Sequence, residues 1–191
     1  MNRQHSDPNA PWNPLKPVPI TPQEFERQVL EWVRASLETG AAEVKHHAKA
    51  KGRGGEYTID IRIRLTVLDG AIIDLCLECK NQQRAVERDE LIILEGKLRD
   101  TGSHKGMLFS TSGFQKGAIE YASAHGIATI TIIAGEWLYE TRAFDPTSQP
   151  PPELGLPRFA GIRVESTEGS VRSRTIIPEH MDPLADFLQP Q

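Results

Sequence analysis

Two acids and one lysine on neighbouring segments of this chain have the residue types of a phosphodiester-cleaving site. Asp60 lies within the apolar run 57–61, and Glu78 and Lys80 close the next apolar run. A hard cation such as Mg²⁺ prefers carboxylate oxygens, and attack on a phosphodiester needs neutralised charge and an activated water. A lysine beside the cation can orient that water. These residues therefore indicate metal-assisted cleavage of a phosphodiester.

Alternating polarity predicts that the two acids lie on the strands of one hairpin. Residues 57–67 and 73–80 alternate between apolar and polar side chains, with an Asp-Gly pair at the turn. A two-residue loop would set Asp60 opposite Cys79, whereas a three-residue loop sets it opposite Glu78. Only the second register puts both acids on one face. We therefore expect a loop of odd length or a bulge.

The remaining chain predicts helices that alternate with strands around this hairpin. A capping box at Thr21–Glu24 begins a helix that should run to about Thr39, and a weak strand over 42–50 and a basic loop over 51–55 follow. Later elements are expected as helices over 86–100 and 115–124 and strands over 107–110 and 127–133. This order, αβββαβαβ, predicts an α/β fold with a mixed central sheet flanked by helices.

Proline-rich segments flank this core, so one folded domain with irregular ends is expected. Residues 1–20 should form a disordered arm, residues 21–143 the core, and residues 144–191 a linker followed by a small β-hairpin. That hairpin is expected as an appendage that mediates assembly or covers a sheet edge. The 191 residues contain no membrane-length apolar run and no signal-peptide pattern, so a cytoplasmic location is the default expectation.

Basic residues cluster ahead of the Asp60 strand although the net charge of the chain is -4. The cluster comprises Lys45, Lys49, Lys51 and Arg53, followed by Arg62 and Arg64. Such a row could follow the phosphates of a nucleic acid. An ordinary solvated surface is the equal alternative, because an acidic chain lacks the overall basic footprint of most nucleic-acid binders.

Three other groups of potentially reactive side chains are expected to have no catalytic role. Cys76 and Cys79 form a C-x-x-C whose spacing sends the thiols to opposite faces of a strand, so both should be reduced and buried. His46 and His47 are adjacent, so they should point to opposite faces and not chelate one ion. The hydroxyls of residues 110–112 lack a recognisable histidine and acid, which favours a structural turn.

The ordered set of motifs resembles the Mrr-like branch of the PD-(D/E)xK nucleases. The resemblance covers residues 21–133, with matching segments at 21–26, 59–61, 77–80, 109–115 and 118–127. It implies a restriction-endonuclease-like fold and a DNA endonuclease that depends on Mg²⁺, or on Mn²⁺, and restricts foreign or modified DNA. Because double-strand cleavage needs two active sites, a homodimer is one expected arrangement.

The resemblance also implies a role for each site residue. Asp60 and Glu78 would bind the metal, and the backbone carbonyl of Cys79 would face it. Lys80 would position or help to deprotonate the attacking water and stabilise charge at the phosphate. The acid of the first helix fits Glu26, since the capping box already explains Glu24.

Several alternatives remain open at the level of sequence. Glu26 could find its partner in a metal-bound water, in Lys80 or in a surface arginine, and Gln82 could contact the DNA backbone or simply end a strand. Asp60 and Lys80 could form a salt bridge without catalytic role. The whole protein could be a non-cleaving module that binds DNA or a protein, or a nuclease for structured nucleic acid. No separate DNA-reading domain is recognisable, so no target is predicted.

Overall fold

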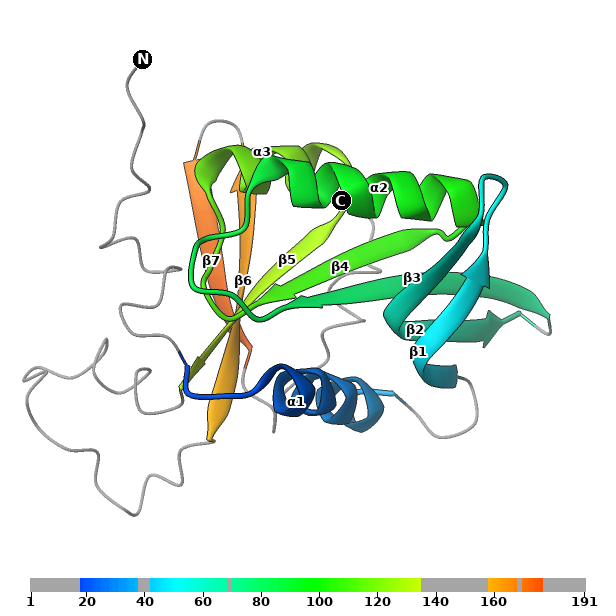
Figure 1. Ribbon diagram of the computed structural model, residues 1–191, viewed down its shortest axis with the longest axis horizontal. Helices are drawn as coiled ribbons and strands as arrows, with labels where there is room; N and C mark the ends of the chain where they lie inside the picture. The colour runs from blue at the N-terminus through cyan, green and yellow to red at the C-terminus, as the bar shows by residue number, and fades with distance from the viewer. Residues whose placement is uncertain (1–17, 38–41, 69, 135–157, 168–169, 177–191) are drawn as a thin grey trace, which may run out of the picture.

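A seven-stranded mixed sheet with helices on both faces organises the protein (Figure 1). The structure is a computed structural model that describes residues 18–37, 42–68, 70–134, 158–167 and 170–176. The elements are α1 (Pro22–Ala35), β1 (Ala42–Lys51), β2 (Glu56–Val67), β3 (Ala71–Lys80), α2 (Arg88–Thr101), β4 (Lys105–Ser110), α3 (Lys116–Ala124), β5 (Ala128–Ala134), β6 (Phe159–Thr167) and β7 (Ser170–Ile176). The strands lie in chain order, β3 and β5 run parallel to β4, and the other neighbours are antiparallel. The predicted order of elements and the mixed sheet are confirmed.

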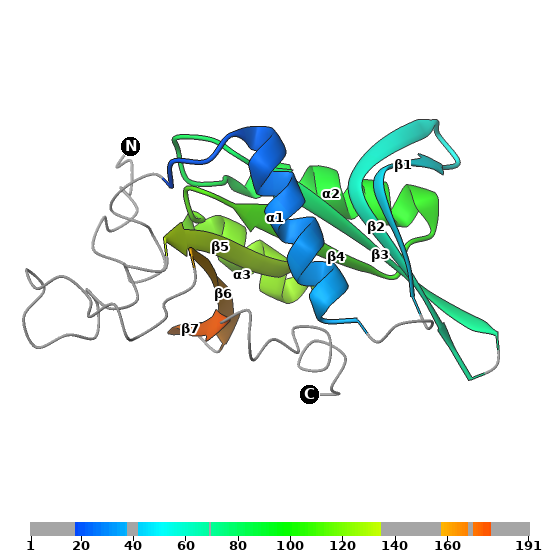
Figure 2. The same cartoon turned by 90° about the horizontal axis from the view of Figure 1, so that it is seen from below.

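Two apolar layers hold the helices against opposite faces of the sheet. Figure 2 shows α1 crossing one face, with α2 and α3 on the other. Alternate strand residues divide between the layers: Leu75 and Leu77 of β3 pack with the α1 side, and Cys76 packs with the α2 and α3 side. Because period-2 alternation sends neighbouring side chains to opposite faces, one strand serves both cores.

Helix α1 begins at the predicted capping box but ends earlier than predicted. The Thr21 hydroxyl accepts from Glu24 N at 3.3 Å, and Glu24 Oε2 accepts from Thr21 N at 3.0 Å. The helix ends at Ala35, where we had expected about Thr39. Ser36 is the C-cap, and its hydroxyl donates to the carbonyl of Val33 at 2.9 Å. A serine that bonds its own backbone competes with further helical turns.

The register of the β2–β3 hairpin is the one that the site requires. Val67 pairs with Ala71, so the loop has three residues, and the pairing continues to Ile61 with Leu77. One further step along the same register sets Asp60 opposite Glu78. The predicted odd-length loop is therefore confirmed.

The predicted C-terminal hairpin exists, but it belongs to the main sheet. Strand β6 pairs antiparallel with β5 over six residue pairs, and β7 pairs with β6. Phe159, Ala160, Ile162 and Val164 of β6 are buried. We had expected an appendage; instead the hairpin covers the edge that β5 would otherwise expose, which was the alternative use considered for it.

The ends of the chain lie largely outside the described residues. The proline-rich arm can be followed only at residues 18–20, where Val18 is buried in the core on the α1 side although we had counted it in the arm. The linker over 144–157 lies outside the described ranges. In the described ranges, no helix combines the length and the apolar character of a membrane span.

Candidate active site

Asp60 occupies the point where β2 separates from β3. The residue pairs of this hairpin end at Ile61 and Leu77, so the backbone N–H of Cys79 has no ladder partner on β2. Asp60 Oδ2 accepts that N–H at 2.8 Å. An unpaired buried N–H is costly, so the carboxylate replaces a missing strand contact. This hydrogen bond holds the half-buried Asp60 side chain beside the end of β3.

Glu78 lies opposite Asp60 and is paired with a lysine that the sequence analysis missed. Its side chain is only 8% exposed, and Glu78 Oε1 accepts from Lys97 Nζ of α2 at 2.8 Å. The signal for Lys97 was its place on the buried stripe of α2, three residues after Leu94 and one before Leu98. A lysine there must extend its stem along the core to reach a partner.

Burial and like charge make the two acids hold their protons more tightly than usual. Burial is the main cause that raises the pKa of Asp60, opposed by the Cys79 N–H, while the charge of Glu26 adds to the rise. Burial also raises the pKa of Glu78; the Lys97 hydrogen bond opposes this, and the Asp60 charge adds to it. Two carboxylates that disfavour their own ionisation fit a site where a cation supplies the missing positive charge.

Lys80 faces the acids without being bound to one of them. It is half-buried at the end of β3, and its charge lowers the pKa of Asp60, Glu78 and Glu90 alike. Among the described residues, Lys80 forms no salt bridge, so the alternative of a salt bridge to Asp60 is not realised. The ammonium is therefore available to a ligand.

Glu90 lies near Lys80, and Gln82 follows the end of β3. Glu90 Oε2 is buried without a hydrogen-bond partner in the described residues, and burial raises the pKa of this carboxyl. The Gln82 amide nitrogen donates to the Arg84 carbonyl at 2.9 Å, and Gln82 N donates to Thr111 Oγ1 at 3.2 Å. Gln82 thus serves the chain segment that follows β3.

Glu26 of α1 contacts two histidines of β1, which corrects our expectation for the orientation of the two rings. Glu26 Oε2 lies 3.0 Å from His46 Nε2 and 2.7 Å from His47 Nε2. We had expected the adjacent histidines to point apart. They do not, because His47 adopts a left-handed backbone with φ of 48°, which breaks the alternation of β1. The partners considered for Glu26 did not include these rings.

The cysteines point to opposite faces as predicted, but only Cys76 is fully buried, and Cys79 is half-buried. Cys76 packs on the α2 side and Cys79 on the α1 side, and both thiols are free. Burial raises the pKa of each thiol, so neither is a ready thiolate. The Ser112 hydroxyl donates to the Arg84 carbonyl, and Phe114 is fully buried beneath the turn.

The basic residues of β1 line the same face of the β1–β2 hairpin as Asp60. Lys45 pairs with Arg62, and Lys49 with Thr58, so these lysines flank the position opposite Asp60. Both lysines are exposed, as are Lys51 and Arg53 in or beside the loop. Their contacts are with surface groups, Lys45 with Glu43 at 2.7 Å and Lys49 with Thr58 at 2.9 Å.

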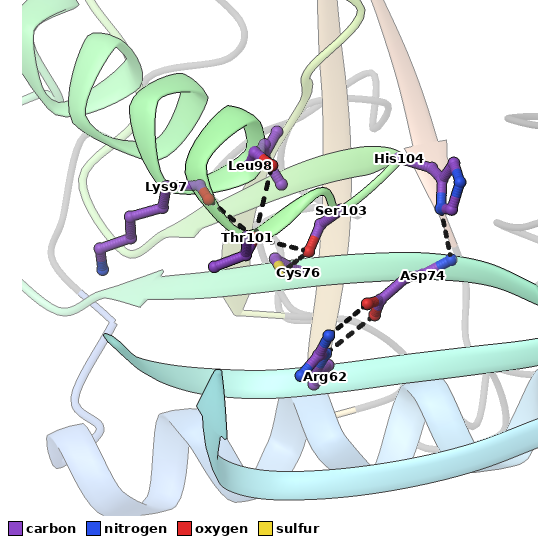
Figure 3. Close-up of polar contacts among 8 residues, drawn as sticks. All are labelled: Arg62, Asp74, Cys76, Lys97, Leu98, Thr101, Ser103 and His104. Atoms are coloured by element: carbon purple, nitrogen blue, oxygen red, sulfur yellow. Dashed lines mark hydrogen bonds and ion pairs between the residues drawn. The ribbon is translucent and has the colours of Figure 1, made fainter. Parts of the chain in front are cut away.

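A polar network behind the acids fixes β2 and α2 to β3 (Figure 3). Arg62 donates Nε to Asp74 Oδ1 at 2.9 Å and a second hydrogen bond from Nη2 to Oδ2. On the other side of β3, the Cys76 thiol donates to Ser103 Oγ at 3.2 Å, just beyond the end of α2. Arg62 is therefore committed within the fold, unlike the lysines of β1.

Comparison with known proteins identifies the family. The Mrr_cat family of restriction endonucleases matches residues 19–141. The chain belongs to this family. The expected resemblance and the restriction-endonuclease-like fold are thus confirmed.

Two solved structures are similar to this Mrr_cat protein. One is a protein of unknown function, AF1548, with 22% identity and a TM-score of 0.45 over 55% of this chain and 54% of that one. The other is the DNA modification-dependent restriction endonuclease AspBHI, with 22% identity and a TM-score of 0.36 over 53% of this chain and 25% of that one. The chain thus spans about half of the first protein and a quarter of the second. Curated protein sequences gave no significant match.

Proposed function

We propose that the protein is a Mg²⁺-dependent endonuclease that hydrolyses phosphodiester bonds of DNA, in restriction of foreign or modified DNA. The observation that carries the proposal is the juxtaposition of Asp60, Glu78 and Lys80 where β2 separates from the end of β3. The two carboxyls have raised pKa values, and the lysine is free of salt bridges to described residues. Membership of the Mrr_cat family supports the reaction class.

The residues at this point fit a hard divalent cation. Asp60 and Glu78 would hold it, with the backbone carbonyl of Cys79 as a third oxygen donor. All three donors are oxygens, which Mg²⁺ and Mn²⁺ accept, and the burial that disfavours both carboxylates is relieved by a bound cation. When bound, the metal would neutralise phosphate charge and lower the pKa of a water.

The two lysines have different parts in the proposed reaction. Lys80, free of salt bridges, would orient the attacking water and stabilise charge that develops on the phosphate. Lys97 is bound to Glu78 and opposes the rise in the pKa of that buried carboxyl, so it is a positioning residue. The exposed row Lys45, Lys49, Lys51 and Arg53 would contact DNA phosphates next to Asp60.

A plasmid assay tests the proposed activity and substrate together. Supercoiled DNA is incubated with the purified protein with and without Mg²⁺, using methylated, unmethylated and branched substrates in parallel. We expect nicked or linear product only with the metal. Lys80→Met should reduce the rate by about a hundredfold or more, because it removes a group that acts in the transition state.

A control variant tests whether the loss of one positive charge is by itself enough to reduce the cleavage rate. Lys116→Met removes an exposed lysine of α3 and should cleave like the wild type. Equal cleavage by Lys80→Met and Lys116→Met would refute the role of Lys80. Binding of DNA without cleavage of any substrate would favour the alternative of a non-cleaving module, and cleavage of branched substrates alone would favour a structure-specific nuclease.

A further inference from the structure

The proposed hydrolysis makes no use of the cluster formed by Glu26, His46 and His47. One atom of each side chain, Glu26 Oε2 and the two Nε2 atoms, lies within 4.8 Å of the other two. Helix α1 supplies the carboxylate and β1 supplies both imidazoles. The side chains are 20%, 35% and 57% exposed in that order, so the cluster is open to water on one side.

The three atoms are close enough together to become ligands of one ion. Glu26 Oε2 lies 3.0 Å from His46 Nε2 and 2.7 Å from His47 Nε2. Ligand atoms about 2.1 Å from a common cation are about 3.4 Å apart in a tetrahedral arrangement, so a small outward shift of the rings would bring these atoms to ligand spacing. Without a cation, both rings must donate an N–H to the same oxygen. Once those protons leave, both nitrogen lone pairs become available to a cation beside the carboxylate.

The backbone of β1 is distorted at the residue that completes the cluster. His46 pairs with Ile61 and Ala48 with Ile59, so the strand is regular on both sides of His47. Within β1, His47 alone has a positive φ, of 48°, which a residue with a side chain rarely adopts. Its ring consequently lies beside that of His46, with centroids 3.8 Å apart. Residues held in rare conformations concentrate at functional sites.

We propose that Glu26, His46 and His47 form a binding site for a divalent transition metal of the Zn²⁺ class. Two imidazole nitrogens and one carboxylate oxygen are ligands that suit zinc, cobalt and similar ions, whereas Mg²⁺ selects oxygen. Three protein ligands and an open side leave the remaining positions to water or an anion. The bound ion would join α1 to the middle of β1.

This site lies next to the proposed Mg²⁺ site but differs from it in donor chemistry. The charge of Glu26 contributes to the raised pKa of Asp60, which shows that the two carboxylates are close. The Asp60 side is built from oxygens, whereas this side offers two nitrogens. The two sites can therefore be titrated separately, with Mg²⁺ in excess to fill the first.

Titration with Co²⁺ in excess Mg²⁺ tests the proposal on protein without a histidine tag. Cobalt substitutes for zinc and gives visible absorption bands that report nitrogen ligation. We expect bands that saturate at one ion per chain. His46→Gln and His47→Gln should each weaken binding by at least about tenfold, because each removes one of three ligands. His125→Gln removes an exposed histidine of the α3 end and should bind like the wild type.

Further outcomes decide between a metal site and a mere ion pair. Asp60→Asn should retain the cobalt bands, because it alters only the oxygen site. Loss of the bands in this variant would show that Asp60 takes part in binding the cobalt, and would refute a separate site. Bands that survive in a His46→Gln and His47→Gln double variant, or no bands in the wild type, would also overturn it, and the latter would leave only a histidine–glutamate pair.

A readout on the unaltered protein covers variants that fail to fold. Zn²⁺ should shift the ring ¹⁵N resonances of His46 and His47 and leave that of His125 unchanged. Absence of this selective shift would contradict the site. None of these readouts measures cleavage, so their failure is distinct from a failure of the proposed nuclease activity.

Discussion

At the scale of residues, the candidate site combines an excess of buried negative charge with two lysines that share the task of balancing it. Lys97 is bound to Glu78, and Lys80 is free of salt bridges to described residues. The two acids and Lys80 could be predicted from the sequence, because the alternation of apolar and polar residues shows on which face of their strands they lie. Lys97 was missed, because a lysine of an amphipathic helix is normally expected to face the solvent.

Replacement of Lys97 should shift the pH dependence of cleavage. Lys97→Met removes the charge that lowers the pKa of Glu78, so this pKa rises further above its ordinary value. A metal ligand must be deprotonated, so the acidic limb of the rate profile should move to higher pH, and the rate at neutral pH should fall about tenfold or more. Lys97→Arg retains the charge and should keep the limb near its original position. Identical profiles for both variants would contradict this role.

Asp60→Asn should not destabilise the metal-free protein. The folded state raises the pKa of Asp60, so it binds that proton more tightly than the unfolded state, and ionisation costs stability above the folded pKa. An asparagine keeps an oxygen for the Cys79 N–H and removes the charge. The melting temperature at neutral pH should therefore be equal or higher, and the difference should disappear below the ordinary pKa of aspartate. A lower melting temperature would show that the carboxylate stabilises the fold.

At the scale of elements, the hairpin β2–β3 and the bend of β1 decide which side chains meet. The hairpin register followed from period-2 alternation and the need to bring Asp60 opposite Glu78, so it could be predicted. The bend at His47 could not, because a left-handed residue inside a strand has no reliable local signal. The end of α1 at Ala35 was also missed, since the apolar stripe continues to Leu37 while Ser36 already caps the helix.

The β2–β3 loop carries strain that a single substitution should relieve. Leu68 has φ of 47° and is 94% exposed, so its side chain gains no packing in return for a left-handed backbone. Leu68→Gly should raise the free energy of unfolding by up to about 1 kcal/mol, as the relief of the left-handed conformation outweighs the entropy that glycine loses. Urea denaturation measures this. A loss of stability would indicate that Leu68 has a contact beyond the described residues.

At the scale of the whole molecule, an acidic chain must present a local basic surface to hold DNA. The net charge is -4, and the exposed lysines of β1 flank the position opposite Asp60. From the sequence alone, a row of lysines that contacts DNA phosphates and an ordinary solvated surface were equal alternatives. The fold favours the row, because strand pairing places it on the face that carries the acid.

The salt dependence of DNA binding should report that row. For Lys45→Gln combined with Lys49→Gln, the slope of log affinity against log salt should become shallower by about 2, since each lost phosphate contact contributes about 0.9. Lys116→Gln combined with Arg172→Gln alters basic residues elsewhere and should leave the slope unchanged. Filter binding of a duplex in Ca²⁺ over a range of salt supplies the measurement, and equal slopes for the two double variants would exclude the row as the DNA surface.

The most direct test of the central claim is the rate of plasmid cleavage by Asp60→Asn beside the wild type in saturating Mg²⁺. This substitution keeps the hydrogen bond to Cys79 and removes only the charge that would bind the metal. Asp89→Asn, at an exposed acid of α2, controls for loss of one negative charge. We expect the Asp60 variant to lose at least about a hundredfold in rate, and the control to cleave like the wild type. Cleavage at the wild-type rate by folded Asp60→Asn would contradict a metal-dependent centre at Asp60 and Glu78.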